Sequence, residues 1–291
     1  MPTQHRPTPA SAALAATAAL VLSATAASAQ AGRADLRYVA PMPTAIVITT
    51  VDSVTSTMTG TPMGDMTTNG VMSSVSELRF EADGDALMVT ARLREMSGRI
   101  STPMGDMPIN MDAGEATTFR MGATGPDPEE LYAAAAGTGA AGPGASPEDA
   151  MGGSRALSGL LALPGRELGL GETWTDTVRV SPTVDGMTFD MEVHIHGTYA
   201  RDTVVAGRTL NVLEITTNMV LKAEGTAEGM NIAQEMNSEG EETVLWDSAR
   251  RMAVHRDATA TMTGTTSMPQ MGMSFGLNSR TRSIATGALP D

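Results

Sequence analysis

Strict alternation of apolar and polar side chains is the feature that most constrains how this chain can fold. In residues 187–195 every second side chain is apolar, and the side chains between them are polar or charged. The same alternation recurs in residues 213–221, 230–236 and 271–277. A period of two residues is that of a β-strand with one face in a core and the other in water. These stretches therefore predict long, half-buried β-strands.

Short turns that contain glycine separate the alternating stretches. They lie at residues 83–85, 185–186 and 206–208. Glycine adopts positive φ without penalty, so a glycine-containing turn between two alternating stretches favours a β-hairpin. Strands joined in this way predict an antiparallel sheet.

One region interrupts the pattern. Residues 126–136 carry acidic side chains near their start and alanines at their end, which predicts a short helix because acids stabilise a helix N-terminus. Residues 133–153 are rich in Gly, Ala and Pro and predict a flexible insert, and a second short helix is expected at residues 154–161. We expect residues 30–291 to form a single β-rich domain rather than two domains, because neither half has many bulky core residues.

The N-terminus has the pattern of a secretory signal. Arg6 precedes an uncharged, alanine-rich stretch, and Ala27 and Ala29 provide the small residues that a signal peptidase reads. Residues 1–29 are therefore expected to be a signal peptide that is cleaved before Gln30, so that the mature chain is exported. A membrane anchor is the weaker interpretation, because Ala and Thr dominate the stretch. No later stretch is apolar enough to form a membrane-spanning helix.

Composition excludes several classes of function. The chain has no cysteine, so it forms no disulfide and carries no lipid-modified cysteine. It has 33 acidic and 19 basic residues, with a formal net charge of −14. Binding to nucleic acid or to an anionic membrane needs a basic surface, so neither is expected as a partner.

Methionine is unusually common, with 23 residues. Its thioether is a soft ligand that suits Cu(I). Three clusters could supply such ligands: Met63 and Met66; Met104, Met107 and Met111; Met268, Met271 and Met273. Most methionines, however, share the alternating positions with Leu, Ile, Val and Phe, which is the pattern of core residues. We therefore interpret them as apolar side chains, keep copper binding as an alternative, and expect no cofactor.

The sequence contains no recognisable catalytic or metal site. His194 and His196 lie on one face of a predicted strand, but zinc sites usually need three or four converging ligands, and only His255 is left to contribute. A solvated polar face is therefore the preferred interpretation of these two histidines. No serine lies in a nucleophile elbow, there is no cysteine nucleophile, and nucleotide-binding motifs are absent. We assign no catalytic residue and do not expect an enzyme.

Two short stretches resemble a known group of proteins. Leu163 and Pro164 precede Gly-Leu-Gly-Glu-Thr-Trp at 169–174, and Val-Leu-Trp-Asp at 244–247 precedes Arg-Arg-Met at 250–252. Both are similar to stretches of exported bacterial proteins with long strands rich in Met, Thr and Gly. Those proteins in turn resemble the half-barrel envelope proteins of the LolA/LolB lipoprotein-carrier type. The resemblance implies a mainly β fold: a curved antiparallel sheet, or half-barrel, with one or two short covering helices.

The expected function is non-enzymatic binding of an apolar, lipid-like ligand in a methionine-lined half-barrel, because methionine adapts to varied apolar partners. The expected ligand-binding residues are Met191, Met219, Met230, Met273, Phe189 and Phe275. A structural or protein-interaction module with a packed core is the alternative, and copper binding by methionine comes third. The expected location is the periplasm, with the extracellular space as the alternative. The oligomeric state cannot be predicted from these patterns.

Overall fold

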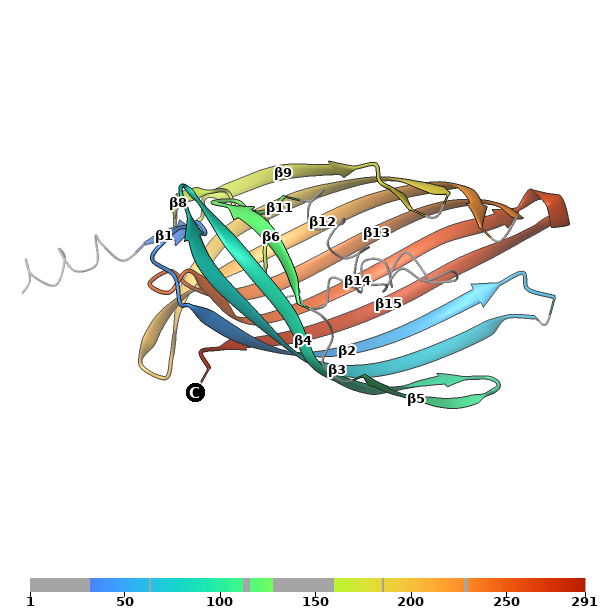
Figure 1. The fold of residues 1–291 in the computed structure, drawn as a ribbon, viewed down its shortest axis with the longest axis horizontal. Coiled ribbons are helices and arrows are strands. Elements are labelled where there is room, and N and C mark those ends of the chain that lie inside the picture. Colours follow the sequence, from blue (N-terminus) through green and yellow to red (C-terminus); the bar gives the residue numbers. More distant parts are fainter. Residues whose placement is uncertain are drawn as a thin grey trace, which may run out of the picture.

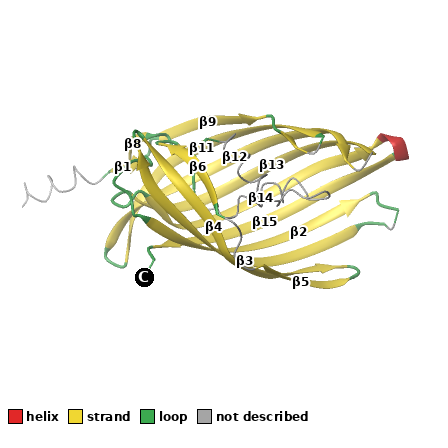
Figure 2. Cartoon of the chain, viewed as in Figure 1, coloured by secondary structure: helices red, strands yellow, loops and turns green. Residues whose placement is uncertain are grey.

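The structure, a computed structural model, describes residues 32–62, 64–111, 116–127, 160–184, 186–227 and 230–290. Most of these residues lie in β-strands (Figure 1; Figure 2). The strands are β1 (Arg33–Leu36), β2 (Ala45–Thr59), β3 (Met66–Asp83), β4 (Ala86–Thr102), β5 (Gly105–Met111), β6 (Thr117–Gly122), β7 (Gly125–Pro126), β8 (Arg166–Gly169), β9 (Thr173–Val180), β10 (Thr183–Val184), β11 (Met187–Val205), β12 (Arg208–Ala227), β13 (Met230–Asp247), β14 (Met252–Met268) and β15 (Met273–Ala288).

Helix is nearly absent from the described part of the chain, where the one helical element is the 3-10 turn η2 (Pro269–Met271). The covering helices expected at 126–136 and 154–161 fall almost wholly outside the described residues. The signal peptide at 1–29 and the insert at 133–153 lie outside them as well.

Thirteen strands form one antiparallel sheet in the order β10-β11-β12-β13-β14-β15-β2-β3-β4-β6-β7, with β9 also paired to β11 and β5 to β4. The last strand, β15, pairs with β2, so strands from the two ends of the chain lie side by side in the middle of the sheet. The sheet curls strongly into a half-barrel (Figure 1). The predicted fold class, a mainly β protein with a curved antiparallel sheet, is confirmed.

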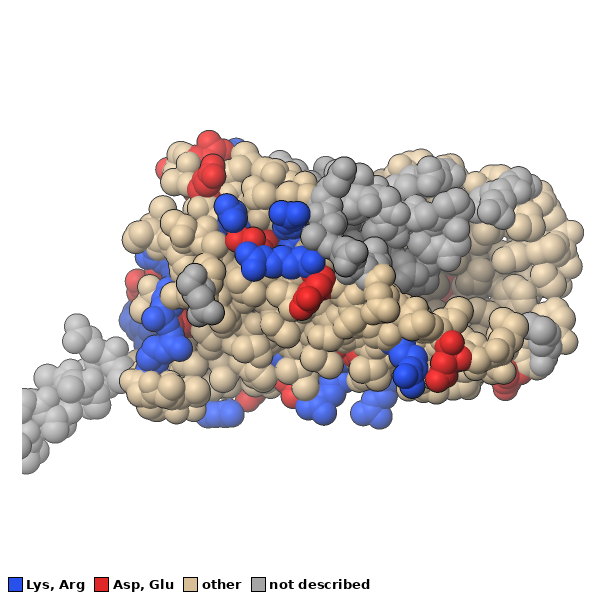
Figure 3. Space-filling model, turned by 60° about the horizontal axis from the view of Figure 1, so that its bottom comes forward, with Lys and Arg blue, Asp and Glu red and all other residues tan. Residues whose placement is uncertain are grey.

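The alternation in the sequence divides the two faces of the sheet as predicted. On β11, Met187 and Tyr199 are buried, whereas Thr188, Asp190 and His196 are exposed. The same division continues on β12, where Ile215 and Leu221 are buried and the exposed polar residues are Glu214, Thr216 and Lys222. The concave face is mainly apolar but also buries four polar side chains, Thr50, Ser74, Ser76 and Ser279. The convex face carries Thr, Asn and charged residues together with exposed valines at 51, 71 and 220. Figure 3 shows Lys, Arg, Asp and Glu side chains on one outer face of the molecule, most of them toward the end that carries β1 and β8.

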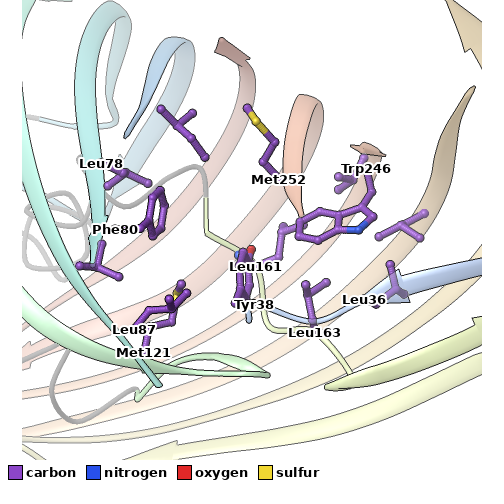
Figure 4. Packing of buried hydrophobic residues seen from close by; sticks show 14 of the residues in the cluster. Leu36, Tyr38, Leu78, Phe80, Leu87, Met121, Leu161, Leu163, Trp246 and Met252 are labelled. Carbon is purple, nitrogen blue, oxygen red and sulfur yellow. The ribbon is translucent and has the colours of Figure 1, made fainter. Parts of the chain in front are cut away.

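One end of the half-barrel is filled by a hydrophobic core. The two-stranded sheet of β1 and β8 and the segment around Leu161 and Leu163 pack against the ends of the long strands. Tyr38 meets Trp246 edge to face, with ring centroids 5.4 Å apart. The Tyr38 hydroxyl accepts a hydrogen bond of 2.9 Å from the Leu161 backbone N–H. Figure 4 shows these side chains converging inside the curl of the sheet, and we call this region the closed end.

A second, smaller cluster lies further along the concave face. Leu221, Met236 and Met262 are buried there, with partly buried side chains packed against them: Phe189, Met191, Met219 and Leu277. Met236 and Met262 thus serve as apolar core residues, in agreement with the interpretation from the alternation, whereas four methionines at or near hairpin turns are exposed: Met58, Met104, Met107 and Met271.

The hairpin at residues 206–208 has the geometry that its sequence predicts. Ala206 and Gly207 have φ of 50° and 76°, and the successive positive values match a type I′ turn between strands with right-handed twist. This turn places Arg208 at the start of β12, at the closed end of the molecule.

Candidate anion-binding cavity

The turn between β13 and β14 connects the closed end to the first strand of the chain. The Trp246 indole N–H donates a hydrogen bond of 2.8 Å to the Asp35 carbonyl, and the Asp35 N–H donates one of 3.2 Å to the Ser248 hydroxyl. Ser248 in turn donates a hydrogen bond of 2.6 Å to the Asn211 side chain. The turn is therefore fixed on one side by β1 and on the other by β12.

Asp247 holds two arginine side chains together beside this turn. Its Oδ2 atom lies 3.2 Å from Arg208 Nη1 and 3.3 Å from Arg250 Nη1. Its Oδ1 atom accepts a hydrogen bond of 3.1 Å from the Arg250 backbone N–H. The Asp247 side chain is only 6% exposed, whereas those of Arg208 and Arg250 are 47% and 38% exposed. One carboxylate therefore faces two guanidinium groups, which leaves one unit of positive charge accessible from outside.

The two arginines form part of the wall of a cavity of about 280 Å³. The other lining residues come from the start of β14 and from the end of the chain: Met252, Val254, Gly287, Ala288 and Leu289. The cavity is half open and combines a cationic wall with the apolar side chains of Met252, Val254 and Leu289. Guanidinium groups bind carboxylate and phosphate oxygens through paired, charge-assisted hydrogen bonds. The arrangement suits a small organic anion with its charged group against the arginines and its apolar part against Met252 and Leu289.

A neighbouring ion-pair network around Asp35 stabilises the β13–β14 turn. Arg251 adopts a positive φ of 55° and donates hydrogen bonds to the Val39 and Pro41 carbonyls and to Asp35. Arg37 also contacts Asp35, at 2.6 Å. Burial opposes the ionisation of Asp35, but Arg37 and Arg251 outweigh it and hold the pKa of Asp35 below its usual value. These contacts compensate for a backbone conformation that is uncommon in a residue with a side chain.

A second polar network, of neutral and acidic groups, lies on the other side of Asn211. The Tyr199 hydroxyl donates to Asp202, and the Asn211 side chain donates hydrogen bonds of 3.0 Å to Tyr199 and 2.9 Å to Asp202. Burial, together with the hydrogen bond to Asp202, raises the pKa of Tyr199 to about 12. Tyr199 therefore stays protonated at neutral pH and acts as a structural hydrogen-bond donor.

The residues predicted to bind an apolar ligand all lie on the concave face, at two levels of burial. Phe189, Met191 and Met219 pack against the second cluster. Met230, Met273 and Phe275 are partly buried near the far ends of their strands. None of the six lines the cavity with Arg208 and Arg250.

The structure does not gather the candidate metal ligands. His194 is half exposed and contacts Glu192 at 3.0 Å and Thr177 at 3.2 Å, and His196 is exposed. Within the described ranges, no three His, Asp or Glu side chains are grouped so that they could hold a metal ion. The methionine clusters lie around three different hairpins, β2–β3, β4–β5 and β14–β15; Met63 lies outside the described residues.

Sequence reasoning missed the cavity but contained a signal for it. The two short stretches that carried the family resemblance, 163–174 and 244–252, both lie at the closed end. The second of them supplies Asp247, Arg250 and Met252. Arg208 and Leu289 are far from it in the sequence, and only the pairing of the strands brings them to the same place.

Comparison with known proteins identifies no family for this chain. No protein-family model and no curated protein matches it. Among solved structures, the COG4313 outer membrane channel from Pseudomonas putida F1 matches with 10% identity and a TM-score of 0.37, over 87% of this chain and 98% of that one. OccK1 (OpdK) of Pseudomonas aeruginosa matches with 5% identity and a TM-score of 0.21, over 84% and 99%. OmpT of Vibrio cholerae matches with 8% identity and a TM-score of 0.18, over 86% and 99%.

These comparisons correct the predicted relationship to the LolA/LolB carriers, which is wrong. The matched structures are outer-membrane proteins instead of lipoprotein carriers. The predicted function rested on that relationship and is wrong as well. It was the binding of a lipid-like ligand in a methionine-lined periplasmic half-barrel. The matches agree with an envelope location and do not single out the periplasm.

The activity of those channels is not transferred to this chain, because the likeness is too distant. Among the described residues, no helix is long and apolar enough to cross a membrane.

Proposed function

We propose that this exported protein captures a small organic anion at the closed end of its half-barrel, in the cell envelope. The observation that carries the proposal is the convergence of Arg208 and Arg250 on a single buried carboxylate, Asp247, at the wall of a cavity that also has apolar side chains in its lining. The function is binding without catalysis, in line with the absence of a catalytic constellation from the sequence.

The chemistry of the cavity defines the class of ligand. A fully hydrated inorganic ion would make no use of the apolar side chains of Met252, Val254 and Leu289 in the cavity wall, whereas a purely apolar molecule would leave one guanidinium charge unpaired. A cavity of about 280 Å³ is at the small end of ligand sites, so the ligand is a compact one. Short-chain or aromatic carboxylates and small phosphate esters meet all three conditions.

Isothermal titration calorimetry with benzoate, hexanoate and glycerol phosphate tests the proposal. At least one of these probes should bind the wild-type protein, and the double variant Arg208→Gln/Arg250→Gln should bind it at least tenfold more weakly, because each charge-assisted hydrogen bond contributes about 1.5–3 kcal/mol. Arg99→Gln is the matched control, since it removes an exposed arginine on β4 that is not part of the cavity.

Two results would refute the proposal. One is a lack of binding by all three probes at millimolar concentration. The other is equal binding by the wild type and the double variant, since this would place the bound anion elsewhere on the molecule.

A further inference from the structure

Three neighbouring strands place rows of opposite charge on the convex face. Glu239 on β13 lies in register with Thr261 on β14, which lies in register with Arg280 on β15. The next row contains Glu241, Thr259 and Arg282 in the same order. All six side chains are exposed. Because adjacent strands are about 4.8 Å apart, the glutamate row and the arginine row are roughly 10 Å apart, with a threonine row between them.

Three of these four charges make no ion pair with another side chain in the part of the chain that the structure describes. Among the described residues, no salt bridge joins Glu239, Glu241 or Arg280 to another side chain, whereas Arg282 contacts Asp257 at 2.8 Å. At the closed end, by contrast, Asp247 pairs with both Arg208 and Arg250, and Asp35 pairs with Arg251. Glu239, Glu241 and Arg280 are thus available to an external partner.

We infer that this strip is an interface with a second copy of the same chain. If a two-fold axis runs parallel to β14 in the plane of the contact, β13 of each copy faces β15 of the other, and positions along the strands are preserved. Glu239 then faces Arg280 of the other copy, and Glu241 faces Arg282. The row before them places Asn237 opposite Asn278, since both are in register with Thr263. The same surface of each copy makes the contact, so association stops at the dimer.

The side-chain lengths fit two convex surfaces. Such surfaces approach most closely along their middle strand and diverge on either side. The middle strand carries short threonines at outward positions 259, 261, 263 and 265, and the flanking strands carry the long Glu and Arg side chains that can span a wider gap. A uniformly anionic partner would be repelled by the glutamate row, and a uniformly cationic one by the arginine row, so the strip favours a copy of itself.

The inferred dimer is held mainly by exposed charge pairs, so it should be weak and sensitive to salt. Sedimentation velocity of the full mature chain at about 100 µM should show a dimer at low ionic strength and at least tenfold weaker association in 0.5 M salt. Glu239→Arg and Arg280→Glu should each give a monomer at low ionic strength. Arg99→Glu, an equal change of charge on β4, should leave the dimer intact.

Mixing provides the decisive measurement. In a mixture of Glu239→Arg and Arg280→Glu, the arginine at 239 of one variant faces the glutamate at 280 of the other. The second pair, Arg280 with Glu239, is unchanged. The two monomeric variants should therefore form a heterodimer. A wild-type chain that stays monomeric at low ionic strength would overturn the inference, and so would a mixture that fails to associate. Neither result would bear on the anion cavity, which lies at the closed end.

Discussion

The buried ion pair between Glu242 and Arg256 provides a quantitative test of how the closed end is stabilised. The two side chains lie on β13 and β14 and are 14% and 18% exposed. Arg256 Nη2 donates a hydrogen bond of 3.0 Å to Glu242, Nε makes a second contact, and Nη1 reaches the Leu160 carbonyl. Burial opposes the charge on Arg256, but Glu242 outweighs it and keeps the pKa of Arg256 above its usual value.

Arg256→Met should lower the free energy of unfolding by about 3–5 kcal/mol, because it leaves the Glu242 carboxylate buried without a counter-ion. Two charges about 4 Å apart attract each other by about 4 kcal/mol at an effective dielectric constant of about 20, which is the same order. The double variant Arg256→Met/Glu242→Leu removes both charges and should lose less than about 2 kcal/mol relative to the wild type. The singles and the double thus form a cycle whose interaction energy is large and favourable.

Urea unfolding followed by tryptophan fluorescence measures all of these differences, since Trp246 lies in the same core. Arg179→Met is the control, because Arg179 forms an exposed pair with Glu192 and should cost less than about 1 kcal/mol. The reasoning is refuted if Arg256→Met costs no more than this control, or if the effects of the two single substitutions add.

Three further outcomes follow from contacts in the structure. Asp35 has a pKa below its unfolded value of 3.8, so its contribution to stability is present at neutral pH and is lost as the pH falls through the lowered pKa; Asp35→Asn should reduce stability at pH 7 and flatten the acid limb of a pH–stability curve. Gly197→Ala should cost about 1–3 kcal/mol and change the near-UV circular dichroism, because the new Cβ would lie 2.2 Å from the Trp174 ring. His194→Ala with His196→Ala should shift a thermal melt by no more than a control substitution, and a loss of several degrees would show that these exposed side chains support the fold.

Much of the sheet could be predicted from the sequence because the physics that determines it is local. Alternation along β11 and β12 identified the buried side chains, and the turn at 206–208 fixed a hairpin, since both depend on neighbouring residues alone. The strand order could not be obtained in this way. The pairing of β15 with β2 joins residues more than 200 positions apart, and no local pattern encodes it.

The candidate site was missed for a related reason. Arg208 and Arg250 are unremarkable as single arginines in a chain with 19 basic residues. Their role depends on Asp247. The fold buries this carboxylate and pairs it with both guanidinium groups, because the β11–β12 and β13–β14 turns lie close together. The methionines led to a wrong functional prediction. Their adaptable apolar side chains suggested a lining for a ligand, but some of these side chains are packed in the protein core.

The position of β1 also determines when the closed end can form during folding. Arg33 pairs with a residue 134 positions later, and the Asp35 carbonyl with an indole 211 positions later. A chain that emerges N-terminus first therefore presents its first strand long before any partner exists, and closing such long loops slows folding. The anion cavity is completed later still, because residues 287–289 form part of its wall. Ligand binding should consequently report on the last step of folding, and a chain truncated before β15 should be unable to bind however much of its sheet has formed.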